Sequence, residues 1–403
     1  MPTAGVLSRE MLNSDADLDR LTTQRRGRER RAVAWVYLVS GAALGGWLSR
    51  VPTVKAQLGV DDAAWGAIAI AGGLGALVAM LLTRRFIDRV GAKPLMFVAV
   101  PAQLTLVVVN GFASSTLALV LGLVAWGLTN GAMTAAMNAH GVIVERHYGR
   151  VIMPSFHACW SGGALLGALL GAGAARLGLA PSLQFAVTGA LLLAGSARAA
   201  KFLPDDLIVK GKPEHSRFTR QIVLISAIAF CSQIAEGAAS QWSAIYVHDF
   251  LRATASMGAI AYAAYSLAMT AGRTAGSRVV ERLGRVRTLT LCTTIGPAGF
   301  ALGLLTGTVA GTIAGLVVLG FGLSCVIPTA YSLGSNQPGV TPGSGASTIG
   351  LASWPAGLIG PPLIGFLSGA TSLRTALLGV AALAAVIAVL SRRVRDIAPP
   401  STA

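Results

Sequence analysis

Twelve apolar runs follow one another along this chain, and each is long enough to cross the roughly 30 Å hydrocarbon core of a bilayer as a helix. Inside a bilayer no water satisfies the backbone polar groups, so open strands are excluded and helices are required. We therefore predict an all-α integral membrane protein with twelve transmembrane helices. The predicted spans are residues 32–50, 63–83, 94–112, 116–144, 154–175, 182–202, 220–245, 256–279, 287–306, 310–334, 345–370 and 374–391.

Composition and the placement of charge support a lipid environment. The chain is 54% hydrophobic and 12% charged, whereas soluble domains carry about 25% charged residues. A net charge of +16 would suggest a nucleic-acid partner for a soluble protein. If both termini are cytoplasmic, however, 27 of the 32 lysines and arginines lie at the cytoplasmic side, as the positive-inside rule requires. The charge is then a topology signal, and we expect no nucleic-acid binding.

The chain divides into two six-helix halves that resemble each other. The segment Arg85–Gly91 after the second helix matches Arg278–Gly284 after the eighth, 193 residues later, and the same offset relates Gly127 to Gly320. Such a repeat, with a substrate site at mid-membrane between the copies, occurs in several transporter folds. The expected parts are a disordered basic cytoplasmic tail (1–31), the N-terminal half (32–203), a cytoplasmic linker (204–219), the C-terminal half (220–395) and a cytoplasmic C-terminal tail (396–403).

The two repeated loops resemble the loop signature of the major facilitator superfamily, roughly G-x-x-x-D-R-x-G-R-[KR]. The positions that they keep are Asp88, Arg89, Gly91 and Lys93 in the first copy, and Arg282, Gly284 and Arg285 in the second, where Glu281 stands for the aspartate. Arg84 and Ser277 occupy the first glycine position, and Ala92 replaces the first basic residue of the first copy. The resemblance implies the major facilitator fold, in which helices 1, 4, 7 and 10 line a cavity and helices 3, 6, 9 and 12 face lipid.

A narrower resemblance comes from polar residues within the spans. Asn138 and His140, the following Glu145-Arg146, and Phe156-His157 resemble the bacterial YbjJ-like and MosC-like branch, as does the Trp47–Pro52 segment. That branch implies a bacterial transporter of small polar organic solutes, and its MosC-like members are associated with a rhizopine, an aminated inositol. The Gly-Pro pair on helix 5 that is typical of drug/proton antiporters is missing.

Glu236 is the one acidic residue deep inside any predicted span. An ionisable group there is costly and therefore suggests function. We interpret Glu236 as a carrier of the coupling proton, with a structural partner for a cation as the alternative. Arg50, at the end of the first helix, is expected either to grip the solute or Glu236 or to extend toward the interface. His157 could relay protons because histidine titrates near pH ~6.5, or it could simply pack.

Two helices carry continuous polar faces. Asn130, Thr134 and Asn138 recur every four residues on the fourth span, and Gln233, Glu236, Ser240 and Ser243 share one face of the seventh. We expect both faces to line the cavity, with Trp242 beside them, although such stripes can also join helices through hydrogen bonds. A third face, formed by Tyr262, Tyr265, Met269 and Arg273 on the eighth span, is interpreted as inter-helix packing, with a substrate site as the alternative.

Charged residues of both signs lie at the predicted cytoplasmic ends. Acidic members are unnecessary for a positive-inside signal, so we expect charge pairs that lock a cytoplasmic gate in one state and break in the other. The expected gate residues are Asp88, Arg89, Gly91, Lys93, Glu145, Arg146, Arg150, Glu281, Arg282, Gly284 and Arg285.

These features predict a secondary active transporter in the bacterial inner membrane that moves a small polar organic solute by alternating access, coupled to protons. Export of drugs or metabolites and a non-transporting sensor or scaffold are the alternatives. The sequence lacks HExxH, GxSxG and P-loop motifs, so we do not expect an enzyme. The four cysteines lie in apolar runs without a CxxC pair, so we expect neither metal nor cofactor. We also expect the protein to be a monomer.

Overall fold

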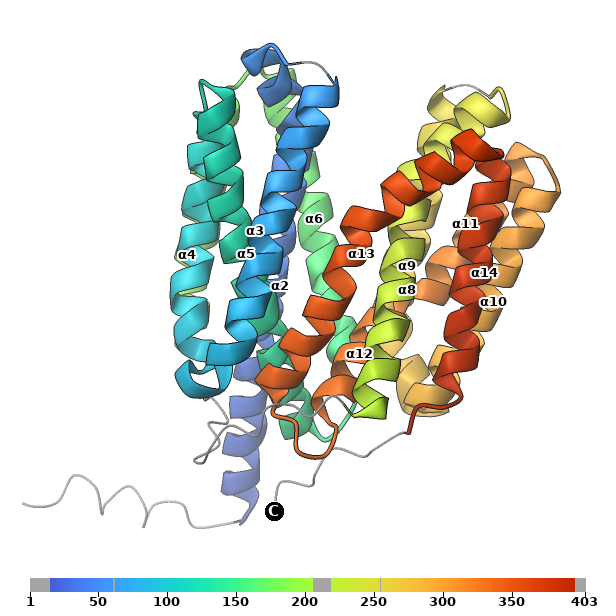
Figure 1. Cartoon of the computed structure of the whole chain (residues 1–403). Coiled ribbons are helices and arrows are strands. Elements are labelled where there is room, and N and C mark those ends of the chain that lie inside the picture. The colour runs from blue at the N-terminus through green and yellow to red at the C-terminus, as the bar shows by residue number, and fades with distance from the viewer. Residues whose placement is uncertain (1–14, 61, 206–218, 254, 396–403) are drawn as a thin grey trace, which may run out of the picture.

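The computed structural model describes residues 15–60, 62–205, 219–253 and 255–395, and these residues form helices joined by short connections (Figure 1). The N-terminal half comprises α2 (Asp15–Leu58), α3 (Asp62–Val90), α4 (Ala92–Gly111), α5 (Thr116–Tyr148), α6 (Met153–Arg176) and α7 (Pro181–Ala200). The C-terminal half comprises α8 (Arg220–Ile245) with the π-helix η1 (Tyr246–Phe250), α9 (Ala255–Leu283), α10 (Arg285–Leu305), α11 (Val309–Ser324), α12 (Val326–Ser335), α13 (Pro342–Ala370) and α14 (Leu373–Ser391).

The predicted all-α membrane fold is confirmed. Within the described ranges, nine helices are long and apolar enough to cross a membrane. The remaining three predicted spans lie in α3, α9 and α13, each 29 residues long. At about 1.5 Å per residue, a helix of that length exceeds the thickness of the hydrocarbon core.

The span predicted at 310–334 is one helix interrupted at Cys325, between α11 and α12. Pro328 has no backbone N–H and so cannot bond to the carbonyl of Ser324, four residues earlier. The chain resumes its helical bonds with Thr329, whose N–H donates to the Cys325 carbonyl at 3.1 Å. The break gives α12 a direction of its own at the interface between the halves (Figure 1).

The sequence repeat is a structural repeat. In the N-terminal half α2 packs on α6, α3 on α5 and α4 on α7, and the equivalent pairs in the C-terminal half are α8 on α13, α9 on α11 and α10 on α14. Gly91 and Gly284 both adopt positive φ, at 88° and 81°, immediately before α4 and α10. A side chain at either position would be strained, which explains a glycine in both copies of the loop.

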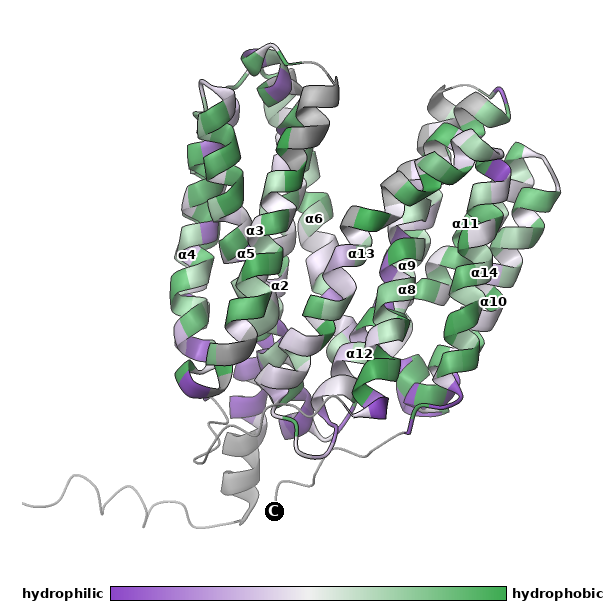
Figure 2. Cartoon of the chain, in the orientation of Figure 1, coloured by the Kyte–Doolittle hydropathy of each residue, from purple (hydrophilic) through white to green (hydrophobic). Residues whose placement is uncertain are grey.

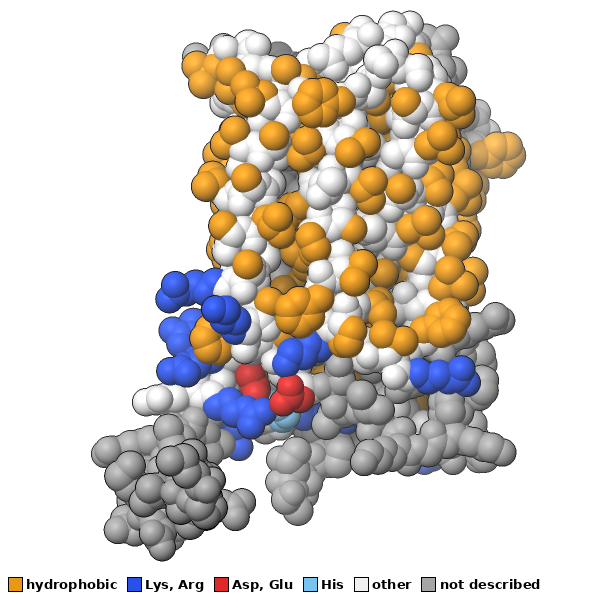
Figure 3. Space-filling view, turned by 90° about the vertical axis from the view of Figure 1, so that its left-hand side faces the viewer, with side chains coloured by type: hydrophobic (Ala, Val, Ile, Leu, Met, Phe, Trp, Pro, Cys, Tyr) orange, Lys and Arg blue, Asp and Glu red, His pale blue; other side chains and the backbone are white. Residues whose placement is uncertain are grey.

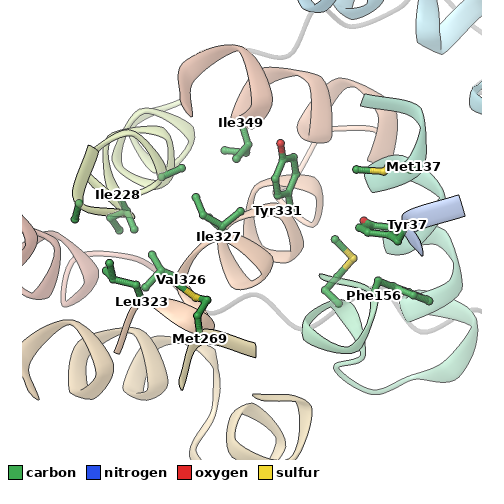
Figure 4. Close-up of a cluster of buried hydrophobic side chains, with 14 of the residues drawn as sticks. Tyr37, Met137, Phe156, Ile228, Met269, Leu323, Val326, Ile327, Tyr331 and Ile349 are labelled. Atoms are coloured by element: carbon green, nitrogen blue, oxygen red, sulfur yellow. The ribbon is translucent and has the colours of Figure 1, made fainter. Parts of the chain in front are cut away.

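The halves meet at one end of the bundle and diverge toward the other (Figure 1). We call the meeting end, where α2 begins and α14 ends, the lower end. Across the interface α3 packs on α13 and α6 on α9, again an equivalent pair, while α12 contacts α5 and α6. Figure 4 shows Tyr37, Met137 and Phe156 of the N-terminal half beside the C-terminal Ile327 and Tyr331, and all five belong to one buried cluster. The two halves therefore share a core at the lower end.

Apolar side chains cover the outer surface. Val98 on α4, Leu191 on α7 and Leu302 on α10 are 69%, 70% and 66% exposed, which suits helices that face lipid. Charged side chains gather at the lower end instead (Figures 2 and 3). The arrangement agrees with the lipid-facing role implied for the third, sixth and ninth spans.

The expected disorder of the tail is wrong for residues 15–31, because α2 begins at Asp15. Glu29, 4% exposed, accepts from Arg25 at 3.0 Å and lies 2.8 Å from His147 Nδ1 of α5. Arg28 covers the ring of Phe202 and Arg30 that of Tyr148. These contacts with α5 and the end of α7 stabilise a polar helix that apolar periodicity could not reveal. The first 14 residues, most of the linker (206–218) and the C-terminal tail lie outside the described residues.

Candidate functional site

An ion pair inside the bundle joins α8 to α9. Arg273 Nη2 donates to Glu236 Oε1 at 3.0 Å, and the two side chains are 6% and 25% exposed. Ionisable groups at such positions are rare and usually functional. The sequence leaves open whether Glu236 carries a proton or pairs with a cation, and the structure supplies the cation. We take this ion pair as the centre of the candidate site.

Arg273 also reaches across the interface between the halves. Its Nη1 donates to Ser161 Oγ on α6 at 2.7 Å. The sequence places Arg273 on a face that favours inter-helix packing over a substrate site, and in the structure this residue joins α6, α8 and α9. Because one guanidinium contacts both halves, its hydrogen bonds depend on how the halves are placed relative to each other.

Three buried polar atoms of residues around the pair have no hydrogen-bond partner within the described parts of the chain: Arg273 Nε, Tyr265 Oη and His157 Nε2. Tyr265 lies two turns before Arg273 on α9, and His157 lies one turn before Ser161 on α6. Buried polar atoms are nearly always hydrogen-bonded in folded proteins. Unpartnered atoms beside an intramembrane ion pair are what a site for a polar ligand would present.

His157 belongs to an aromatic layer below the pair. Its ring lies edge-on to that of Tyr37, with 5.3 Å between the ring centroids, and stacks on that of Tyr331, with 6.0 Å between the centroids. His157 therefore lies between α2 and α12. Tyr37 Oη donates to Asn138 Oδ1 at 2.9 Å. Tyr37, Asn138 and Tyr331 are all buried. Of the predicted site residues, His157 therefore lies in the closed contact between the halves, and Asn138 is buried behind Tyr37 within the N-terminal half.

The polar faces predicted on α8 and α5 are partly accessible. Gln233, Glu236 and Ser240 are half-buried on one face of α8, whereas Ser243, the fourth member, is buried. On α5, Asn130 is half-buried and its Oδ1 accepts from Gln103 Nε2 of α4 at 3.3 Å. This contact accounts for the polar Gln103 on a helix that otherwise faces lipid.

Arg50 and Trp242 lie apart from the ion pair. Arg50 is 1% exposed and donates to the carbonyl oxygens of Leu179 at 2.6 Å and Gly171 at 3.5 Å. It thus fixes the end of α6 and makes no recorded contact with Glu236, contrary to one of the expectations from sequence. Trp242 is half-buried against α13 near Gly365.

A second buried carboxylate holds the lower end together. Glu145 at the end of α5 is 1% exposed and accepts from the backbone N–H groups of Ile152 and Met153 at 2.9 Å each. From the other half it accepts from Ser332 Oγ of α12 and from Arg285 Nη2 of α10 at 3.4 Å. We call these five residues the Glu145 cluster. It links the N-terminus of α6 to two helices of the C-terminal half.

Further contacts flank the Glu145 cluster. Arg146 donates to Asn336 Oδ1 at 2.8 Å and to the Ser335 carbonyl at 2.7 Å. Arg150 lies 3.6 Å from Glu281, with side chains 57% and 35% exposed. Five of the predicted gate residues therefore make contacts across the interface: Glu145, Arg146, Arg150, Glu281 and Arg285.

The remaining predicted gate residues with described side chains lie elsewhere at the lower end. Arg89 and Arg282 are exposed, and Lys93 pairs with Asp205 at the start of the linker at 2.9 Å. The side chain of Asp88 lies outside the described residues. Gly91 and Gly284 shape the two loops through their positive φ.

Sequence reasoning missed Ser161, Tyr37 and Ser332, and it misassigned Arg273. A usable signal existed for Arg273 alone, since an arginine inside an apolar span needs a partner and Glu236 is the intramembrane acid. Within the described ranges, no three His, Cys, Asp or Glu side chains gather as metal ligands. A cavity of about 420 Å³ between the start of α2 and the end of α7 is lined by residues outside the candidate site, several of them already paired with one another.

Two six-helix halves related by an internal repeat, with an ion pair at their interface, define a membrane transporter of the major facilitator type. A family model described as Major Facilitator Superfamily matches residues 33–354. The chain belongs to this superfamily, and it is accordingly a multi-pass membrane transporter whose partners are the lipid bilayer and a small solute.

Its relatives include bacterial proteins of similar length. The uncharacterized transporter y4wD of Sinorhizobium fredii (strain NBRC 101917 / NGR234) is 31% identical over 370 residues, covering 90% of this chain and 97% of the relative. Membrane protein MosC of Rhizobium meliloti is 26% identical over 369 residues, covering 89% and 88%. The crystal structure of the transporter FucP in the outward conformation has a TM-score of 0.77 at 16% identity, covering 91% and 98%, and shows the shared fold.

Proposed function

We propose that the protein is a proton-coupled secondary transporter that moves a small polar organic solute by alternating access across the bacterial inner membrane. The observation that carries the proposal is the Glu236–Arg273 ion pair, whose arginine is buried, whose carboxylate is 25% exposed, and which is bonded across the interface through Ser161. Glu236 would take up a proton, lose its attraction to Arg273 and thereby change the hydrogen bonds that connect the halves.

The closed lower end supplies the second element of an alternating-access cycle. With both termini and the 204–219 linker in the cytoplasm, the Glu145 cluster lies on the cytoplasmic side and the halves diverge toward the outside. The likeness to FucP in its outward conformation supports this assignment. Solute would enter from the outside, and its release inward would require the contacts of Glu145, Arg146 and Arg150 to break.

The orientation can be tested by cysteine labelling. In a background that lacks the four native cysteines, a cysteine in place of Lys210 should react with membrane-impermeant maleimide only after the cells are permeabilised, because that residue belongs to the linker. A cysteine in place of Lys55, after the first span, provides the control that labels in intact cells. Labelling at position 210 in intact cells would show that the linker faces outward and that the proposed topology is inverted.

The coupling role of Glu236 is tested by Glu236→Gln, which imitates a permanently protonated carboxyl. Counterflow exchange of solute requires no net proton movement and should survive in proteoliposomes. Accumulation driven by a pH gradient should be lost, and Glu236→Asp should restore part of it. Full gradient-driven accumulation by Glu236→Gln would eliminate Glu236 as the proton carrier.

Transport measurements in the same proteoliposomes also distinguish two competing functions. Export uses the same cycle in reverse and predicts faster flux from the cytoplasmic face under the physiological gradient. A sensor or scaffold that has kept the fold predicts no solute-dependent flux in either direction, with solute binding intact.

A further inference from the structure

The guanidinium of Arg273 has an edge that is only half used. Nε–H and Nη2–H lie on one edge of this planar group, and that edge matches the two oxygens of a carboxylate. Nη2 donates to Glu236 Oε1, but the buried Nε has no hydrogen-bond partner in the part of the chain that the structure describes. Nη1, on the other edge, is engaged by Ser161. Glu236 therefore occupies with one oxygen an edge that a carboxylate could occupy with two.

Charge balance limits what can replace Glu236. Of the helices around α8, α11 and α13 carry no ionisable side chain, and the arginines of α14 lie at its two ends. The other ionisable groups that interact with the pair are Tyr265 on α9, His157 on α6 and Cys325 between α11 and α12. None of these supplies a fixed negative charge. If Glu236 is protonated while nothing else changes, Arg273 is left as a buried charge without a counter-ion, which is strongly unfavourable.

We propose that the solute is a small organic monoanion whose carboxylate replaces Glu236 on the Nε–Nη2 edge of Arg273 when Glu236 takes up the proton. This inference rests on the proposed function, in which Glu236 carries the coupling proton. The proton comes from external water to a carboxylate oxygen of Glu236, and the two oxygens of the solute accept from Nε and Nη2. Tyr265 Oη and His157 Nε2 remain as polar groups for the solute's hydroxyls.

The exchange also fixes the stoichiometry. The empty site holds one negative and one positive side chain, and the loaded site holds neutral Glu236, Arg273 and the anion, so the net charge is zero in both states. One anion and one proton would move together. The transport of a monoanion would therefore respond to the pH gradient and not to the membrane potential.

Binding can be measured by thermal stabilisation of the purified full chain in detergent. The probes are matched by shape and differ in charge: glucuronate, glucose and glucosamine, and short monocarboxylates with their amides. We expect at least one carboxylate to stabilise the wild type at least 10-fold more potently than its uncharged analogue, and more at pH 5.5 than at pH 7.5. If no carboxylate acts more strongly than its uncharged partner, the assignment of an anion is wrong.

Variants assign the effect to the ion pair. Glu236→Gln should respond to the same carboxylate equally at both pH values, because Arg273 is no longer paired with a carboxylate that must first be protonated. Arg273→Lys should bind it at least 10-fold more weakly, since an ammonium lacks the planar edge. The double variant Glu236→Gln/Arg273→Gln carries no unpaired charge and should fold but lose the response. Arg392→Gln, at the exposed end of α14, is the control and should behave as the wild type.

Transport separates this inference from the proposed function. In proteoliposomes with the potential set by valinomycin and K⁺ at 0 or −100 mV, uptake of the active carboxylate under a fixed pH gradient should change less than 2-fold. A potential-driven uptake would contradict the one-to-one exchange. Uptake of a neutral or cationic probe that still depends on protons and on Glu236 would reject the anion and keep the proposed function, whereas uptake without proton dependence would reject both.

Discussion

The two buried carboxylates of this protein have opposite surroundings. Glu145 is 1% exposed and accepts from two backbone N–H groups, a serine hydroxyl and Arg285. The side chain of Glu236 is 25% exposed and accepts one recorded hydrogen bond, from Arg273. A carboxylate whose oxygens are fully bonded holds its neighbours together. A partly exposed carboxylate with one partner can exchange that partner, so we assign Glu145 to the gate and Glu236 to the transport site.

The comparison is tested most severely by removing each carboxylate in turn. Glu145→Ala should cost about 3–5 kcal/mol, because Arg285 and two backbone donors remain buried without a partner. Glu236→Ala should cost less, about 1.5–3 kcal/mol, because it removes a single charge-assisted hydrogen bond and leaves Arg273 bonded to Ser161. Thermal unfolding in detergent measures both, at about 2–4 °C per kcal/mol for a large domain. Equal losses would mean that the two carboxylates do not differ in role.

The second-largest effect is expected on solute flux, when the cytoplasmic gate is changed. Asp88→Asn, in the loop signature, should lower solute flux several-fold while insertion and solute binding stay near normal, because the loop would control exchange between states and not the site. Arg392→Gln serves again as the control. Unchanged flux with Asp88→Asn would reduce the signature loops to topology signals.

The smallest effect is expected at the edge of the gate. The Arg150–Glu281 pair is 3.6 Å apart and largely exposed to water. Arg150→Gln should therefore change stability by about 0–1 kcal/mol, and only at low salt should flux respond. A loss as large as that of Glu145→Ala would show that the exposed pair, and not the buried cluster, closes the lower end.

The fold could be predicted from the sequence because a bilayer leaves few choices. The apolar run at 94–112 became α4 (Ala92–Gly111) and the run at 287–306 became α10 (Arg285–Leu305). The predictions fail where the deciding contact is not apolar. Polar contacts with α5 and α7 hold the helix over residues 15–31, and a missing N–H at Pro328 divides the tenth span.

The candidate site was accessible to sequence reasoning only in part. Glu236 stands out because it is an acid in an apolar run, which is a local property. Its partner Arg273 is 37 residues away in the sequence. The two hydrogen bonds of Arg273, to Ser161 and to Glu236, exist only after α6 and α9 have packed. Sequence reasoning selected Asn138 and His157 as polar residues within or beside apolar spans, but the contact of His157 with Tyr331 forms only where the two halves meet.

The central claim, that Glu236 exchanges its proton with solute movement, is tested most directly by measuring protons and solute together. A pH-sensitive dye inside proteoliposomes reports the proton while labelled solute enters down its own gradient. We predict that the wild type acidifies the lumen in proportion to solute uptake, and that Glu236→Gln still exchanges solute with no change in luminal pH. Equal acidification by the wild type and Glu236→Gln would contradict the assignment.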